Sequence, residues 1–182
     1  MNKQPPHNAS IQALHEDLGI PASYAESCQL AFCEDCADLV ETETDVFGRQ
    51  PLMARPAFAA WQVMQASAEQ DGIVLQIVSA FRSAEYQKDL LQRKLERGDT
   101  LEAILRVNAA PGYSEHHSGC AVDITTPGYT PLEEEFDDSD AFRWLCEHAA
   151  NFGFTLSFPR DNAAGMSYEP WHWKFDEKTI KR

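Results

Sequence analysis

The stretch SEHHSGCAVDITT, residues 114–126, joins a turn-rich loop to a short β-branched segment. From Cys120 onward it alternates partly between apolar and polar residues, which predicts a strand that carries Asp123 on one face. His116 and His117 lie just upstream in the loop, in a chain that has six histidines in all. Because a loop and the strand after it can converge on one ion, a histidine of this pair and Asp123 are candidate metal ligands. A further ligand must come from elsewhere in the chain.

The segment WHWKF, residues 171–175, offers that further ligand. A period of two predicts a strand with one aromatic face and one polar face. The aromatic face carries Trp171, Trp173 and Phe175, and the polar face carries His172 and Lys174. A histidine opposite an aromatic stripe is free to bind a metal.

Glu169 stands three residues before His172 and completes the parts of a hydrolytic zinc site. Such a site needs three protein ligands, an open position for water and a nearby base. Pro170 disfavours a regular strand, so the chain can turn and bring the Glu169 carboxylate to the side of His172. Alone, either short motif also fits a solvated loop histidine with a capping aspartate. Together, the two motifs favour a metal site.

The first 40 residues carry no comparable motif. Residues 1 to about 20 are polar, which predicts a frayed start to the chain. The glycine-free segment 21–40, PASYAESCQLAFCEDCADLV, predicts a helix. Its cysteines, Cys28, Cys33 and Cys36, have the spacing of some iron–sulfur loops, but a helix cannot wrap around a cluster and a fourth ligand is missing. We therefore interpret them as helix cysteines that lie partly in the core.

The middle of the chain predicts a strand between two helices. Residues 54–72 have apolar residues close to helical spacing and end at a glycine. The β-branched run 73–81 predicts a buried strand, and Ser83 is the expected N-cap of a helix that ends at Gly98. Arg82 should then lie at a strand-to-helix junction, where side chains reach the edge of a sheet. Three later segments predict an acidic surface loop over 133–140, a helix over 141–153 and a strand over 154–158.

Composition limits the class of protein. A length of 182 residues fits one domain. A net charge of −14 opposes binding to nucleic acid or to an anionic membrane and suits a small, diffusible substrate. The N-terminal sequence lacks the apolar run of a signal peptide, and five cysteines without a disulfide-like pattern fit a reducing compartment. We therefore expect a soluble cytoplasmic protein, and its oligomeric state stays open.

Three segments together resemble a known family. SAFRSAEYQ, PGYSEHHSGCAVDI and YEPWHWKF are similar to the signature blocks of zinc-dependent D-alanyl-D-alanine carboxypeptidases of the VanY type, which are related to VanX dipeptidases and hedgehog domains. The resemblance covers roughly residues 45–176. It implies an α+β single domain whose mainly antiparallel central sheet is flanked by helices and holds a zinc site in its cleft. Residues 45–182 would form this carboxypeptidase domain, and residues 1–44 a helical extension.

The resemblance also implies roles for individual residues. One zinc ion per chain is bound by His116, Asp123 and His172, with Glu169 as the general base. Arg82 matches the arginine that holds the substrate carbonyl and the developing oxyanion, although a surface salt bridge is its alternative.

Four further residues match positions near the substrate. Gln87 and Ser114 correspond to contacts near its C-terminal end, with an exposed helix residue and a turn former as the alternatives. Trp171 and Trp173 are expected to build the wall of the substrate site behind His172, which core packing alone would also explain. His117 either supports the site or is solvated.

The implied reaction is removal of the terminal D-alanine from peptidoglycan stem peptides. A D,D-carboxypeptidase acts on pentapeptides ending in D-Ala-D-Ala, whereas an L,D-carboxypeptidase acts on tetrapeptides. Because an intracellular enzyme would meet recycled muropeptides, we expect L,D cleavage. The alternative from another class is a non-catalytic zinc-binding recognition domain, as in hedgehog proteins. The presence of both Glu169 and Arg82 favours an enzyme, and a wall-opening endopeptidase is less attractive because the chain lacks a basic patch.

Overall fold

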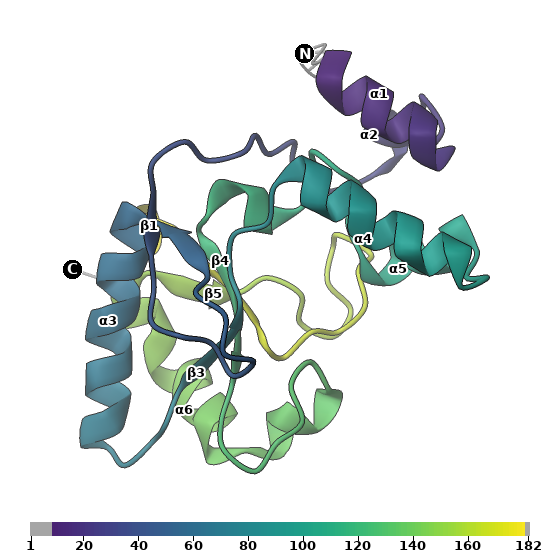
Figure 1. The fold of residues 1–182 in the computed structure, drawn as a ribbon. Coiled ribbons are helices and arrows are strands. Elements are labelled where there is room, and N and C mark those ends of the chain that lie inside the picture. The colour runs from purple at the N-terminus through teal and green to yellow at the C-terminus, as the bar shows by residue number, and fades with distance from the viewer. Residues whose placement is uncertain (1–8, 181–182) are drawn as a thin grey trace.

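A four-stranded antiparallel sheet forms the centre of the molecule. The computed structural model describes residues 9–180. The strands lie in the order β3, β4, β6 and β5. Figure 1 labels β3, β4 and β5 in the middle of the molecule. The bounds of the strands are β3 Gln76–Ser79, β4 Ala121–Thr125, β5 Phe154–Leu156 and β6 His172–Phe175. The register of β4 and β6 sets Asp123 directly opposite His172, and a shift in the β3–β4 pairing lies between Ile77 and Ser79.

Helices cover one face of this sheet with the main hydrophobic core. α3, Arg55–Gln70, buries Trp61 and Met64 against the sheet, and α6, Asp140–His148, adds Trp144 and Leu145. The sheet residues that face this core are Ile77, Val122, Ile124, Phe154, Trp173 and Phe175. Since side chains alternate along a strand, Asp123 and His172 point to the other face. The buried core therefore fixes which side of the sheet carries the polar residues.

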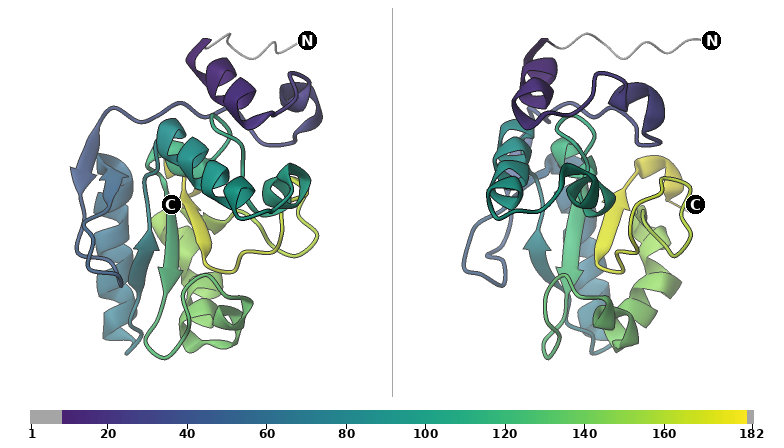
Figure 2. Two further views of the ribbon diagram at one scale, coloured as in Figure 1. Left: turned by 45° about the vertical axis from the view of Figure 1, so that its right-hand side comes forward. Right: turned by 90° about the vertical axis from the view of Figure 1, so that its right-hand side faces the viewer.

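A second, smaller core lies beyond that polar face. It joins α1, Ala9–Leu18, to α4, Ala84–Glu96, and to α5, Leu101–Val107. Figure 2 shows α1 lying against α4 in both views. Leu18, Leu91 and Ile104 are among its buried residues.

Short elements complete the fold. A two-stranded antiparallel sheet pairs β1, Leu39–Glu41, with β2, Leu52–Ala54. The 3-10 helices are η1 Glu115–Ser118, η2 Glu134–Asp138, η3 Ala149–Phe152 and η4 Glu177–Thr179. Antiparallel sheets flanked by helices in one mixed domain confirm the fold class expected from the sequence. Among residues 9–180, no helix is both long and apolar enough to cross a membrane.

Most predicted elements are confirmed. The helix over 54–72 is α3, the strand over 73–81 contains β3, and the helix after Ser83 is α4. Ser83 is its N-cap, because its side chain accepts a hydrogen bond from the backbone N–H of Tyr86. The helix over 141–153 divides into α6 and η3, which ends at a left-handed Gly153.

Two expectations for the N-terminal segment are wrong. Residues 9–18 form α1 with Leu14 and Leu18 buried, so this part is ordered, while residues 1–8 lie outside the described residues. Segment 21–40 is helical only at α2, Tyr24–Ser27, and otherwise runs as irregular chain into β1. Beyond α2, the backbone N–H groups of Cys33 and Cys36 donate hydrogen bonds to a distant loop, which is described below.

The acidic run 133–140 is also more ordered than a solvated loop. It forms η2, whose Phe136 is buried in the main core while Glu134 and Glu135 stay exposed. One apolar residue among the acids anchors the run to the core.

Candidate functional site

Three potential metal ligands meet on the polar face of the central sheet. His116 comes from η1, Asp123 from β4 and His172 from β6, and one ligand atom from each lies within 4.8 Å of the others. All three side chains are buried. η1 ends at Gly119, whose φ of 67° is in the left-handed region, so the chain turns sharply from the histidine into β4. The motif spacing thus reflects one turn followed by one strand.

His116 presents one ring nitrogen to the site. Its Nδ1–H donates a hydrogen bond to the Ala80 carbonyl at 2.6 Å, so Nε2 lies toward Asp123, 3.3 Å from Oδ2. Among residues 9–180, this buried Nε2 has no hydrogen-bond partner. Burial and the charge of Arg82 lower the pKa of His116 to about 4. The lowered pKa favours the neutral ring, which is the form that binds metals.

His172 is held between two carboxylates. Its Nδ1 lies 3.0 Å from Oδ1 of Asp123, and its Nε2 lies 3.0 Å from Oε2 of Glu115. Burial alone would lower the pKa of His172, but these carboxylates raise it to about 10. Burial would likewise raise the pKa of Asp123, but the two histidines lower it well below its usual range.

Glu115 is a site residue that sequence reasoning missed. Its Oε1 accepts a hydrogen bond from Lys174 Nζ at 3.0 Å, while Oε2 accepts from His172. Burial would raise the pKa of Glu115, but the hydrogen bond from His172 and the charges of His172 and Lys174 lower it to about 2. The sequence did place His172 and Lys174 on one polar face of a strand. Two basic side chains on one face favour a nearby carboxylate, and this was the signal that could have indicated Glu115. Carboxylates of this kind orient metal-binding histidines in many proteins.

The donor set fits a zinc ion. Two imidazole nitrogens and one carboxylate oxygen are the ligands of many catalytic zinc sites, which keep a further position open. Nε2 of His116 is buried and has no hydrogen-bond partner within the described part of the chain, so its lone pair is available to a metal ion. The arrangement therefore suits a metal better than a closed network of hydrogen bonds.

Glu169 lies beside the three ligands without being one of them. Its Oε2 is 3.8 Å from Nδ1 of His172. The turn expected at Pro170 places it there, since the backbone N–H of His172 donates to the Glu169 carbonyl at 3.1 Å. Burial raises the pKa of Glu169 to about 7, although the charge of His172 opposes the shift.

Arg82 and Glu169 line the same cleft, which has a volume of about 420 Å³. Arg82 lies between β3 and α4, as the junction predicted. Its Nε is buried and has no hydrogen-bond partner in the described part of the chain. Within residues 9–180, the Arg82 guanidinium forms no salt bridge, so the surface salt bridge considered for it is not present.

Gln87 and Ser114 also line the cleft. Gln87 is buried, against the alternative of an exposed helix residue, and its Nε2 donates to the Ala109 carbonyl at 2.9 Å. The Oε1 of Gln87 is buried and has no hydrogen-bond partner among the residues that the structure describes. The Ser114 hydroxyl accepts a hydrogen bond from the His116 backbone N–H at 3.4 Å and begins η1.

Trp171 and Trp173 lie in different environments. Trp171 is half-buried and lines the cleft. Trp173 packs in the main core, and its Nε1 donates to the Pro170 carbonyl at 2.9 Å. Trp173 therefore has a core position and does not line the cleft, because it points to the opposite face of β6 from His172. His117, in turn, is fully buried, so it is not a solvated histidine.

Comparisons with known proteins agree with this geometry. The sequence model of the D-alanyl-D-alanine carboxypeptidase (VanY) family matches residues 50–178. A D-alanyl-D-alanine carboxypeptidase of Enterococcus faecalis is 34% identical over 120 residues, which are 60% of this chain and 42% of that protein. The chain spans about half the length of the curated relatives it matches.

Two solved structures share the fold. The LD-carboxypeptidase LdcB has a TM-score of 0.69 at 27% identity, over 78% of this chain and 69% of LdcB. A mutant of the vancomycin resistance D,D-pentapeptidase VanY, solved in complex with Zn(II), has a TM-score of 0.59 at 30% identity, over 76% of this chain and 80% of that chain. With the family match covering most of its length, the chain belongs to the VanY family of D-alanyl-D-alanine carboxypeptidases.

Proposed function

We propose that this protein is a zinc-dependent carboxypeptidase that removes the terminal D-alanine from peptidoglycan stem peptides. The observation that carries the proposal is the meeting of His116, Asp123 and His172 within 4.8 Å, with Glu169 beside them in one cleft. One zinc ion per chain would be held by Nε2 of His116, a carboxylate oxygen of Asp123 and Nδ1 of His172.

Each residue of the cleft then has a chemical task. A bound zinc ion supplies Lewis-acid chemistry, which polarises a peptide carbonyl and acidifies a water molecule. Glu169 takes a proton from the attacking water and delivers it to the leaving amine of D-alanine. The Arg82 guanidinium stabilises the negative charge that develops on the carbonyl oxygen, where a fixed cation lowers the barrier most. Trp171 forms one wall of the cleft.

Gln87 and Ser114, which are buried and line the cleft, contact the substrate. The Ser114 hydroxyl can donate to the terminal carboxylate. The Gln87 amide is fixed by its bond to Ala109, so its free Oε1 is an acceptor and suits a substrate N–H. Because an unpaired buried acceptor costs about 1–3 kcal/mol, a substrate that provides the N–H donor is favoured over one that does not.

Tetrapeptides are the favoured substrate, which makes the protein an L,D-carboxypeptidase. The similarity to LdcB supports this choice, while the similarity to a D,D-pentapeptidase keeps pentapeptides as the alternative. In this proposal the enzyme acts inside the cell, on muropeptides recovered from the wall, because all five cysteines are unpaired and suit a reducing compartment. Its net charge of −14 opposes nucleic-acid and anionic membrane partners. The distribution of the tagged protein between cell fractions tests the location.

The substrate is tested by incubating the protein with equal amounts of muropeptide tetrapeptide and pentapeptide, with and without a zinc chelator. Mass spectrometry then follows the loss of alanine from each. Chelator-sensitive loss from the tetrapeptide is the expected result, and loss from the pentapeptide alone would make the enzyme a D,D-carboxypeptidase. No loss from either would contradict the proposal and favour a non-catalytic zinc domain.

A further inference from the structure

The N-terminal segment caps the helix that follows Arg82. The Asp35 carboxylate accepts a hydrogen bond from the backbone N–H of Ala84, at 2.9 Å to Oδ1 and 3.2 Å to Oδ2. Ala84 is the first residue of α4, whose first backbone N–H groups have no partner inside the helix. A carboxylate at this end also favours the helix dipole. A residue 49 positions upstream thus caps α4 together with Ser83.

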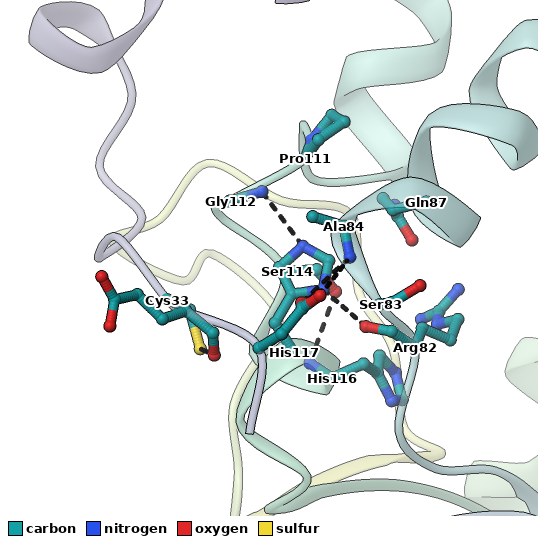
Figure 3. A network of polar contacts seen from close by, with 12 residues as sticks. Cys33, Arg82, Ser83, Ala84, Gln87, Pro111, Gly112, Ser114, His116 and His117 are labelled. Carbon is teal, nitrogen blue, oxygen red and sulfur yellow. Dashed lines mark hydrogen bonds and ion pairs between the residues drawn. The ribbon is translucent and has the colours of Figure 1, made fainter. Parts of the chain in front are cut away.

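His117 holds the peptide group on the other side of this junction. Its Nδ1–H donates to the Arg82 carbonyl at 2.6 Å, and its Nε2 accepts from the backbone N–H of Gly112 at 3.1 Å. Figure 3 shows the ring between these two main-chain groups. The ring is fully buried, and its Nδ1 lies 3.6 Å from Oδ1 of Asp35. Both ring nitrogens are therefore engaged by backbone.

The segment around Asp35 is attached to the same loop by two backbone hydrogen bonds. The N–H of Cys33 donates to the Gly112 carbonyl at 2.7 Å, and the N–H of Cys36 donates to the His117 carbonyl at 2.8 Å. These bonds lie two residues before and one residue after Asp35, so they set its position. They also contribute to the absence of the helix that the composition predicts here, because the N–H groups of Cys33 and Cys36 are used by the loop.

The Arg82 main chain is consequently held on both sides. The Arg82 N–H donates to the His116 carbonyl at 3.3 Å, and the Arg82 carbonyl accepts a hydrogen bond from His117. Two residues further on, the N–H of Ala84 donates to the Asp35 carboxylate. The Arg82 side chain lacks such anchors: within the described residues its guanidinium has no salt bridge, and its Nε is unpartnered. The direction of the guanidinium therefore depends on its backbone.

We propose that His117 and Asp35 are positioning residues that act through Arg82. Neither lines the cleft, so neither contacts the substrate. They hold the peptide groups on the two sides of Ser83, and this fixes the guanidinium where the oxyanion develops. The inference rests on the proposed function for the catalytic task of Arg82. It assigns a role in the active site to a segment that precedes the family match at residues 50–178.

Two isosteric substitutions of His117 separate its two bonds. In His117→Asn, the side-chain amide N–H replaces Nδ1–H and keeps the bond to the Arg82 carbonyl. In His117→Gln, the amide oxygen reaches the place of Nε2 and keeps the bond to Gly112, while the bond to Arg82 is lost. We expect kcat to stay within about threefold of wild type in the Asn variant. In the Gln variant it should fall about 10- to 100-fold with little change in KM, because small misplacements of a catalytic group are costly.

Asp35 has a matched control next to it. Asp35→Ala removes the cap of Ala84 and is expected to lower kcat about tenfold, whereas Glu34→Ala, an exposed neighbour in the same segment, leaves kcat unchanged. Zinc content and thermal unfolding are measured for all four variants. If His117→Asn and His117→Gln lose activity equally, in proportion to lost stability, both residues are merely structural and the inference is overturned.

A second readout does not depend on turnover. The Nε–H signal of Arg82 in ¹⁵N NMR, assigned by its disappearance in Arg82→Lys, reports where the guanidinium lies. It should shift in His117→Gln and Asp35→Ala but stay in place in His117→Asn and Glu34→Ala. An inactive wild-type protein with this NMR pattern would refute the proposed function alone. An active wild type whose Arg82 signal is the same in all variants would refute the positioning role alone.

Discussion

Nε2 of His172 lies 3.0 Å from Oε2 of Glu115, and the other oxygen of Glu115 lies 3.0 Å from Nζ of Lys174. The bond orients the His172 ring so that Nδ1 faces Asp123. Since His172 and Lys174 share one face of β6, a single carboxylate from η1 binds both. The orientation of the His172 ring therefore depends on Glu115. This residue directly precedes His116, which is another potential metal ligand.

Removing this carboxylate should weaken metal binding. We expect Glu115→Ala to lower the affinity for zinc by about 10- to 100-fold, because the ring loses the acceptor that orients it. Competition with a chromophoric chelator measures the change. Glu135→Ala, an exposed acid on η2, is the control and should bind zinc as wild type does. An unchanged affinity in Glu115→Ala would show that β6 packing alone orients the ring.

Arg82 should not be replaceable by lysine. Arg82→Lys keeps a positive charge but loses the planar group with several N–H donors, so we expect kcat to fall about 100- to 1,000-fold, as for the loss of an oxyanion donor. Steady-state kinetics on the favoured peptide measure the effect. Arg93→Lys, on the exposed surface of α4, should have wild-type kcat. A wild-type kcat in Arg82→Lys would remove this arginine from the mechanism.

Glycine is required at position 119 because the backbone there is left-handed and because no space remains for a Cβ atom. At its φ of 67°, a Cβ would lie 2.7 Å from the Ala54 backbone nitrogen, which donates to the Gly119 carbonyl. We expect Gly119→Ala to lower the free energy of unfolding by about 2–4 kcal/mol, from left-handed strain and from the clash together. Gly165 has a φ of 69° but open space around it, so Gly165→Ala should cost only the strain, about 1 kcal/mol. Urea unfolding of both variants gives the difference, and equal losses would rule out the clash.

Asp45 should contribute stability that disappears in acid. Burial would raise the pKa of Asp45, but hydrogen bonds from Arg49 and Phe47 and the charge of Arg49 lower it. The folded-state pKa is thus below that of the unfolded chain, about 3.9. The contribution is therefore complete above the unfolded pKa and is lost as the pH falls through the folded one.

Asp45→Asn measures this contribution. The variant should be less stable than wild type by about 1–3 kcal/mol at pH 7. The difference should shrink as the pH is lowered below 4, because the wild-type carboxylate is then protonated as well. Urea unfolding at several pH values follows both proteins, with Asp138→Asn as an exposed control. A difference that does not depend on pH would mean that the charge of Asp45 is not involved.

The convergence of His116, Asp123 and His172 could be predicted because each of these candidate ligands lies in a segment with a strong local pattern. β4 and β6 alternate between core and polar faces, and Pro170 signals the turn that brings Glu169 to the ligands. The junction at Arg82 followed from a β-branched run and the N-cap at Ser83. These features depend on residues close together in the sequence.

The missed features depend on contacts between distant residues. The backbone of Cys33 and Cys36 bonds to a loop about 80 residues away, which overrides the helix propensity of segment 21–40. Glu115 contacts His172 only once β6 lies beside η1. Trp173 differs from Trp171 because Trp173 is buried in the main core, whereas Trp171 is only partly buried against that core and also lines the cleft. Local periodicity does not contain these relationships.

In the proposed function, Glu169 acts on water at a zinc ion that His116, Asp123 and His172 would hold. The most direct test of this claim measures zinc content and D-alanine release together, in wild type and in Glu169→Gln. We expect both proteins to bind one zinc ion, wild type to lose its activity with a chelator, and the variant to turn over about 100- to 10,000-fold more slowly. Full turnover by Glu169→Gln, or activity in zinc-free wild type, would contradict the claim.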